Sequence, residues 1–224
     1  MRNFTLSTVL AVLSCYSALG QNITDYAFSA SAGSFTVLSG ANGSPGITGT
    51  VDEGYWSSMA IGFDFFYMNV RYTTVSVSTN GWLTLGGPIS TPVPVNNLTT
   101  SGSPRPVLTP LWDNLSVQIG DNASSKTEGS TGSRVFTLQI SNNKWDAFLS
   151  GNTISFQVKL YDAPGSIQYI YRQETAAVNA GSASIGISAT ATGAGNFLSL
   201  NGTGTAPSVS STTETTTLSV KPAI

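Results

Sequence analysis

Apolar and polar residues alternate with a period of two along most of the chain. The clearest stretches are residues 61–67, 136–141 and 154–161, and residues 183–187 repeat the pattern more weakly. Such alternation predicts strands with one face in a core and the other in water. Helical periodicity with capping residues is absent throughout. The sequence therefore predicts an all-β fold, an antiparallel, jelly-roll-like β-sandwich with few or no helices apart from an N-terminal export signal.

One hairpin can be placed in register from its pattern. A two-residue loop at Asn80-Gly81 would divide the apolar residues of the two flanking strands between opposite faces. A three-residue loop that also includes Thr79 pairs Val77 with Leu83 and keeps the apolar residues together, with Gly81 in the left-handed conformation of a bulge. We expect this second register. It would place Trp82 on the face opposite to Val77.

The remaining chain divides into strands and connections. Asp162-Ala163-Pro164-Gly165 predicts a turn that joins residues 154–161 to 167–171 in a second hairpin. Residues 91–110 are rich in proline and predict a long irregular crossover, and residues 120–132 predict a polar loop. We expect a signal peptide at 1–20, a β-sandwich domain at 21–200, and a Ser/Thr-rich linker or closing segment at 201–224 that stops before further modules.

The first 20 residues predict secretion. Arg2 is followed by a short apolar stretch and by Ala18-Leu19-Gly20, a small-x-small cleavage site before Gln21. An alternative is lipid attachment at Cys15, whose preceding residues loosely resemble a lipoprotein box. Nothing in the chain reaches the roughly 20 apolar residues that a spanning helix needs. We therefore expect a secreted or cell-surface protein without a membrane span.

Composition excludes several classes of chemistry. The chain has no histidine and a single cysteine, which lies in the signal peptide. Histidine–serine triads and thiolate or imidazole metal sites are therefore excluded, and the fold cannot depend on internal disulfides. Charged residues make up 9% of the chain, with a formal net charge of −2 and no basic patch, so a nucleic-acid partner is not expected.

Three residues stand out as candidates for ligand binding. Trp82 and Trp112 could stack on a sugar ring, although tryptophan in a β-sandwich more often packs in the core. Asp113 follows Trp112 directly and could offer oxygen ligands, together with Asn114, Asp121 and Asn122. These residues lack the spacing of a calcium loop. We therefore expect no cofactor and no metal site, with calcium as the remaining alternative.

Carboxylates are the only residues left for catalysis. A glycosidase needs two of them about 5–10 Å apart, and in this chain only Asp52 and Glu53 are adjacent in sequence. Neighbouring residues on a strand point to opposite faces. We expect no catalytic residues and no enzyme activity, and a carboxylate glycosidase is the third-ranked alternative.

Several segments in order carry a resemblance to a known family. They are residues 61–65, the hairpin at 75–86 around Asn80-Gly81, Pro110-Leu111-Trp112-Asp113-Asn114-Leu115, the strands at 134–139 and 154–161, and the segments 171–174 and 182–187. Together they resemble the N-terminal β-sandwich of secreted surface proteins from Bacteroidetes-type bacteria, and are distantly similar to the nidogen extracellular domain. The resemblance implies fibronectin type III modules and a type IX sorting domain downstream, neither of which is present by Ile224.

These observations favour a non-catalytic module for adhesion or binding at the cell surface, with an extracellular glycan or protein as its unidentified ligand. The alternative is a carbohydrate-binding accessory domain of a secreted polysaccharide-acting protein, which requires an exposed aromatic platform around Trp82.

Overall fold

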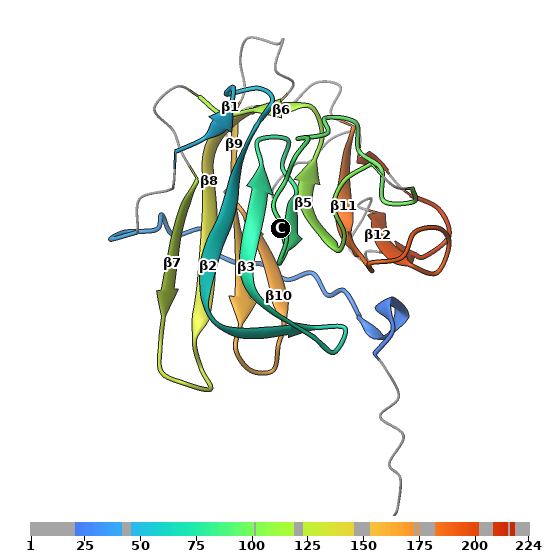
Figure 1. Ribbon diagram of the computed structural model, residues 1–224, viewed down its shortest axis with the longest axis horizontal. Coiled ribbons are helices and arrows are strands. Elements are labelled where there is room, and N and C mark those ends of the chain that lie inside the picture. Colours follow the sequence, from blue (N-terminus) through green and yellow to red (C-terminus); the bar gives the residue numbers. More distant parts are fainter. Residues whose placement is uncertain are drawn as a thin grey trace, which may run out of the picture.

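The fold consists of two antiparallel sheets packed face to face in a computed structural model of the chain (Figure 1). The structure describes residues 21–41, 46–100, 102–118, 123–145, 153–172, 174, 182–201, 208–214 and 216–217. The predicted signal peptide lies outside these residues. Among them the only helical element is a single 3-10 turn, η1 (Ile23–Asp25). The predicted all-β sandwich is confirmed.

The larger sheet has nine strands, in the order β1-β2-β3-β4-β5-β11-β12-β13, with β14 also paired to β11. Its strands are β1 (Thr48–Gly49), β2 (Gly54–Tyr67), β3 (Val70–Ser78), β4 (Leu83–Leu85), β5 (Val107–Trp112), β11 (Ala183–Ser188), β12 (Phe197–Asn201), β13 (Ser208–Ser210) and β14 (Thr216–Thr217). The last two strands show that part of the Ser/Thr-rich segment pairs with this sheet. The domain boundaries proposed from the sequence remain a prediction.

The smaller sheet has five strands, in the order β10-β9-β8-β6, with β7 paired to β8. Its strands are β6 (Leu115–Ser116), β7 (Ser124–Glu128), β8 (Val135–Trp145), β9 (Thr153–Tyr161) and β10 (Ile167–Tyr171). The expectation of a polar loop over residues 120–132 is wrong for β7. This strand has no apolar residue, and it exists because its backbone pairs with β8 at the rim of the sheet, where charged and polar side chains are tolerated.

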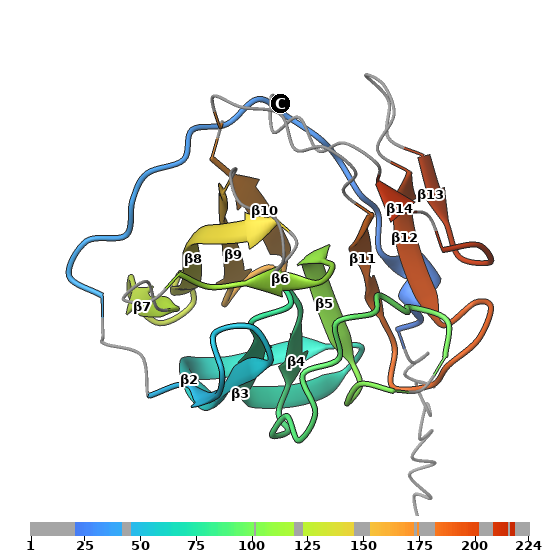
Figure 2. The same ribbon diagram turned by 90° about the horizontal axis from the view of Figure 1, so that it is seen from above.

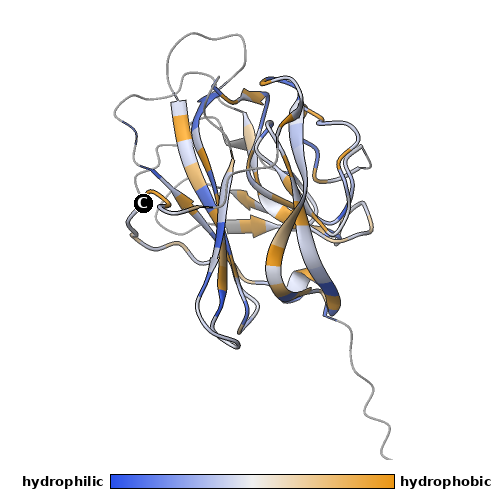
Figure 3. Cartoon of the chain, turned by 60° about the vertical axis from the view of Figure 1, so that its left-hand side comes forward, coloured by the Kyte–Doolittle hydropathy of each residue, from blue (hydrophilic) through white to orange (hydrophobic). Residues whose placement is uncertain are grey.

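The main core lies between the two sheets and is built by the alternating strands. Along β2 the buried and exposed side chains alternate from Met59 to Tyr67, and Figure 3 shows bands of hydrophilic and hydrophobic residues along the strands. Three tyrosine hydroxyls tie strands together around the core, two of them between the sheets and one within the larger sheet. Tyr169 and Tyr171 of β10 donate to the carbonyls of Gly186 and Pro110 at 2.9 and 2.5 Å, and Tyr67 donates to Ser188 at 3.0 Å. Burial raises the pKa of all three hydroxyls.

Both hairpins that the sequence predicts are confirmed in detail. Val77 pairs with Leu83, and Gly81 has a φ of 73°. The strand that begins at Ile167 pairs with β9 through the expected turn. The predicted irregular crossover ends earlier than expected, because Pro110 lies within β5. Two residues of β5 oppose one residue of β11 at this point, and proline is tolerated at such a bulge because one ladder bond is already missing.

The outer faces of both sheets are covered by irregular segments. Residues 86–106, which we name the crossover, lie over the outer face of β4, β5 and β11, and residues 34–41, which we name the strap, run around the outside of the smaller sheet (Figure 2). The sequence predicted solvent on the polar faces of β8, β9 and β11. That expectation is wrong in their central residues, which are buried on both faces because these segments cover them.

Candidate functional site

The structure brings the predicted binding residues Trp82 and Trp112 together. Their ring centroids lie 5.5 Å apart with an interplanar angle of 43°. Each indole Nε1–H donates a hydrogen bond of 3.0 Å to the carbonyl oxygen of Val93 in the crossover. The two side chains are 0% and 1% exposed. Neither ring therefore offers a face to a ligand on the surface.

The burial of these rings follows from a second, smaller core on the outer face of the larger sheet. The three-residue loop places Trp82 on the face away from Val77, as predicted, and the crossover closes over that face. The cluster consists of Trp82, Trp112, Ile89, Leu98, Val107 and Phe197. The exposed aromatic platform at Trp82 that the carbohydrate-binding alternative requires is therefore not present, because apolar side chains of the crossover occupy the space that a sugar would need.

Asp113 holds the end of β5 against the start of β11. Its Oδ2 accepts a hydrogen bond of 2.8 Å from the Ser182 backbone N–H, and its Oδ1 accepts from the Ser182 hydroxyl at 3.1 Å and from the Asn114 N–H at 2.9 Å. Both oxygens are thus engaged within the fold. A direct role of Trp82, Trp112 or Asp113 in ligand binding stays a prediction.

The side chain of Asn80 links several parts of the fold, although the sequence predicted this residue only as part of a turn. Its side chain is fully buried, and its Oδ1 accepts from the Leu115 N–H at 3.1 Å. Its Nδ2 donates to the carbonyl of Pro92 at 3.0 Å and to Oε2 of Glu53 at 3.2 Å. The hairpin loop therefore links β6, the crossover and the start of β2. An Asn-Gly turn signal in the sequence predicts the loop but not these long-range partners.

The described carboxylates hold contacts within the fold. Asp64, Glu128, Asp162 and Glu174 form ion pairs with Arg71, Lys126, Arg134 and Arg172, with N–O distances between 2.6 and 2.8 Å. Glu214 accepts from the Leu98 N–H at 2.8 Å and from the Ser184 hydroxyl at 2.6 Å, which ties the crossover to β11. Within the described chain, no group of three or more acidic, histidine or cysteine side chains is arranged to hold a metal ion. Asp121, Asn122 and Asp146 lie outside that part.

Glu53 is the described carboxyl whose environment most resembles that of a catalytic acid. Burial raises its pKa, the neighbouring charge of Asp52 raises it further, and the hydrogen bond from Asn80 lowers it. In a glycosidase, a carboxyl with a raised pKa acts as general acid opposite a second carboxylate that faces the same substrate. The contact of Glu53 with the buried Asn80 instead makes it part of the hairpin-loop network.

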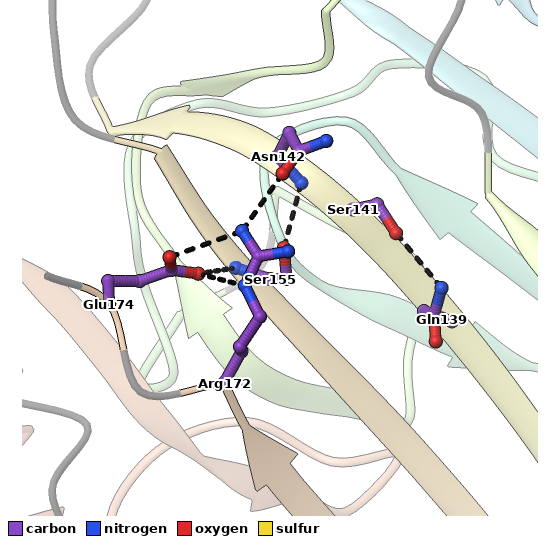
Figure 4. Close-up of polar contacts among 6 residues, drawn as sticks. All are labelled: Gln139, Ser141, Asn142, Ser155, Arg172 and Glu174. Atoms are coloured by element: carbon purple, nitrogen blue, oxygen red, sulfur yellow. Dashed lines mark hydrogen bonds and ion pairs between the residues drawn. The ribbon is translucent and has the colours of Figure 1, made fainter. Parts of the chain in front are cut away.

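A row of polar side chains crosses the outer face of the smaller sheet (Figure 4). Arg172 is bound by both oxygens of Glu174, at 2.8 and 3.1 Å, and by Oδ1 of Asn142 at 2.9 Å. Asn142 sits at a bulge of β8 with a φ of 53°, and its N–H donates to the Ser155 hydroxyl at 2.9 Å. The same row continues to Gln139. These polar groups are thus paired with one another in two sets, one around Arg172 and one between Gln139 and Ser141.

Comparison with known proteins places the chain in a family. A model described as NIDO related matches residues 25–224. The chain belongs to the NIDO-related family. This confirms the distant similarity to nidogen and supports a non-catalytic domain of extracellular type, whereas the Bacteroidetes-type architecture remains a prediction. No curated protein and no solved structure gives a significant match. In the part of the chain described, no helix has the length and apolar character needed to cross a membrane.

Proposed function

We propose that this NIDO-related chain is a secreted, non-catalytic binding module that holds an extracellular glycan or protein at the cell surface. The observation that carries the proposal is that most of the carboxylates in the described part of the chain are engaged in ion pairs and hydrogen bonds of the fold. Membership of the NIDO-related family supports the same conclusion.

The crossover is the surface that we assign to ligand contact. It is a long loop on a rigid sheet, which is where binding residues are commonly placed. Val93 is fixed by the two indole N–H groups, and Val95, two residues further, is 69% exposed. In this proposal Trp82 and Trp112 act indirectly, because they hold the crossover in place. Asp113 likewise fixes the end of the strand beneath the crossover.

A carbohydrate-binding accessory domain is less well supported. Stacking on sugars needs exposed aromatic faces, and all four tryptophans are buried, so that Phe66 of β2, 56% exposed, is the one exposed aromatic side chain among the described residues. A glycan ligand would therefore be held by polar contacts and by the exposed apolar residues of the crossover.

A matched pair of substitutions tests the assignment of the crossover. The chain is screened for saturable binding to extracellular glycans and proteins, and Val95→Asp is compared with Val209→Asp, which alters an exposed valine of β13. We expect Val95→Asp to weaken binding at least about tenfold, the effect of about 1.4 kcal/mol, with an unchanged melting temperature. Equal binding by both variants would exclude the crossover as the ligand surface.

A further inference from the structure

The strap is held on the smaller sheet through its main chain. The side-chain Nε2 of Gln157 donates to the carbonyl oxygen of Thr36 at 2.7 Å. The backbone N–H of Leu38 donates to Oε1 of Gln139 at 2.8 Å. A third bond, from Lys126 Nζ to the carbonyl of Ser39 at 3.1 Å, also ends on the backbone.

Gln139 and Gln157 form one recognition unit. They are directly opposite in the register of β8 and β9, and Nε2 of Gln157 donates to Oε1 of Gln139 at 2.8 Å. Their side chains are 4% and 2% exposed. Buried amides need hydrogen-bond partners, and the carbonyl of residue 36 and the N–H of residue 38 supply them. These two groups point the same way in an extended chain, so the pair presents a donor and an acceptor spaced as on a strand edge.

The side chains of the strap contribute little to this contact. Val37, which lies between the two recognised peptide groups, is 64% exposed, and residues 34–41 include no buried side chain. The contact is therefore insensitive to the side chain of residue 37. Of the strap residues, only Phe35, Leu38 and Ala41 are partly buried, so releasing the strap exposes a limited apolar surface.

We propose that the Gln139–Gln157 pair is a docking site for extended polypeptide, and that the strap of a second copy of this chain can replace the resident strap. The strap is the segment that the structure shows to fit, and every copy carries it. Reciprocal exchange rebuilds the same three hydrogen bonds in both copies, which makes it a low-cost route to a dimer. This self-association goes beyond the proposed ligand binding and does not depend on it.

The first experiment supplies the strap in trans. A fluorescent peptide of residues 29–41 is titrated with the chain from Gln21 onwards, beside the same peptide with Leu38→Pro, which lacks the N–H that Gln139 accepts. We expect saturable binding that is at least about tenfold weaker in the double variant Gln139→Leu/Gln157→Leu, because two hydrogen bonds to the peptide are lost. Gln168→Leu is the matched control, since this exposed glutamine of β10 bonds only to Tyr161 among the described residues. It should bind within about twofold of the wild type.

The second experiment tests exchange between copies. Isotopically light and heavy chains are unfolded together, refolded at high concentration and examined by native mass spectrometry. We expect mixed dimers from the wild type and their loss in the double variant. No binding of the peptide, equal binding of the Leu38→Pro peptide, or equal binding by the double variant would overturn the docking site. Peptide binding without mixed dimers would overturn exchange with a second copy. Melting curves of all variants confirm that each is folded.

Discussion

Trp82 and Trp112 donate their indole N–H groups to one carbonyl oxygen, that of Val93, each at 3.0 Å. One acceptor thus fixes two large rings, one from the hairpin loop and one from β5, beneath the same segment. The shared acceptor makes the middle of the crossover a continuation of the core. It also explains how a long proline-rich loop is held in a defined position on the sheet.

Loss of Trp82 should act on stability. Trp82→Ala removes a fully buried ring and one bond to Val93, so we expect the free energy of unfolding to fall by about 3–5 kcal/mol. The measurement is chemical denaturation. Val95→Ala, at an exposed position of the same loop, should change stability by less than about 0.5 kcal/mol. A Trp82→Ala protein of wild-type stability would show that the ring is not packed as described.

The left-handed position at Gly81 gives a local test of the hairpin register. A Cβ at Gly81 would lie 2.0 Å from the carbonyl oxygen of Leu111, in a backbone with a φ of 73°. We expect Gly81→Ala to destabilise the fold by more than about 2 kcal/mol, since strain and a backbone clash add. Gly87→Ala, where a Cβ meets nothing within 4 Å, should cost less than about 1 kcal/mol. Similar melting temperatures for the two variants would contradict the register.

Acid should weaken the fold through Asp162. The hydrogen bond from Arg134, helped by the N–H of Gly132, lowers the pKa of this carboxyl. A lowered folded-state pKa stabilises the protein above the ordinary value near 3.9, and this contribution is lost as the pH falls through the folded-state pKa. We therefore expect Asp162→Asn to have a lower melting temperature than the wild type at pH 7. On acidification to about pH 2, its melting temperature should fall by less than that of the wild type.

Glu53 provides a comparison of opposite sign. Its pKa is raised, chiefly by burial, so its charge opposes folding once the pH exceeds that pKa. Glu53→Gln should raise the melting temperature at pH 7 more than at pH 4. If the melting temperatures of both variants change with pH in parallel with that of the wild type, these two carboxyls do not cause the pH dependence of stability.

Chelators should leave the stability unchanged. Both oxygens of Asp113 already accept hydrogen bonds from Ser182 and Asn114, which leaves this carboxylate poorly placed as a calcium ligand. We expect the melting temperature to shift by less than about 2 °C on adding chelator. A fall above about 5 °C would establish a structural cation, with Asp113 as the first ligand to test.

Local patterns predicted much of the fold. The two-residue period around Asn80-Gly81 was sufficient for the register, because one slipped residue would expose half of the apolar set. The covering segments were not predictable in this way. Gln139 and Gln157 occupy positions whose side chains would face water in a half-buried strand. Their hydrogen-bond partners Leu38 and Thr36 lie about a hundred residues away in sequence. Local periodicity carries no information on such contacts.

The same reason limited the prediction of the site. The predicted register of the hairpin correctly placed Trp82 on the outer face of the sheet. That face is exposed only if no other segment covers it. The proline-rich segment that covers it has no periodic pattern that would reveal where it packs. The sequence therefore identified Trp82, Trp112 and Asp113 as candidates for ligand binding, and their burial and hydrogen bonds became visible only in the folded chain.

Turnover measured beside binding tests the central claim most directly. The chain is incubated with each extracellular polysaccharide or protein that it binds, and the ligand is analysed for new chain ends by mass spectrometry. A non-catalytic module should bind saturably and return its ligand uncut, and Glu53→Gln should bind within a few-fold of the wild type. Cleavage by the wild type that disappears in Glu53→Gln, or in another single carboxylate variant that still folds, would contradict the account.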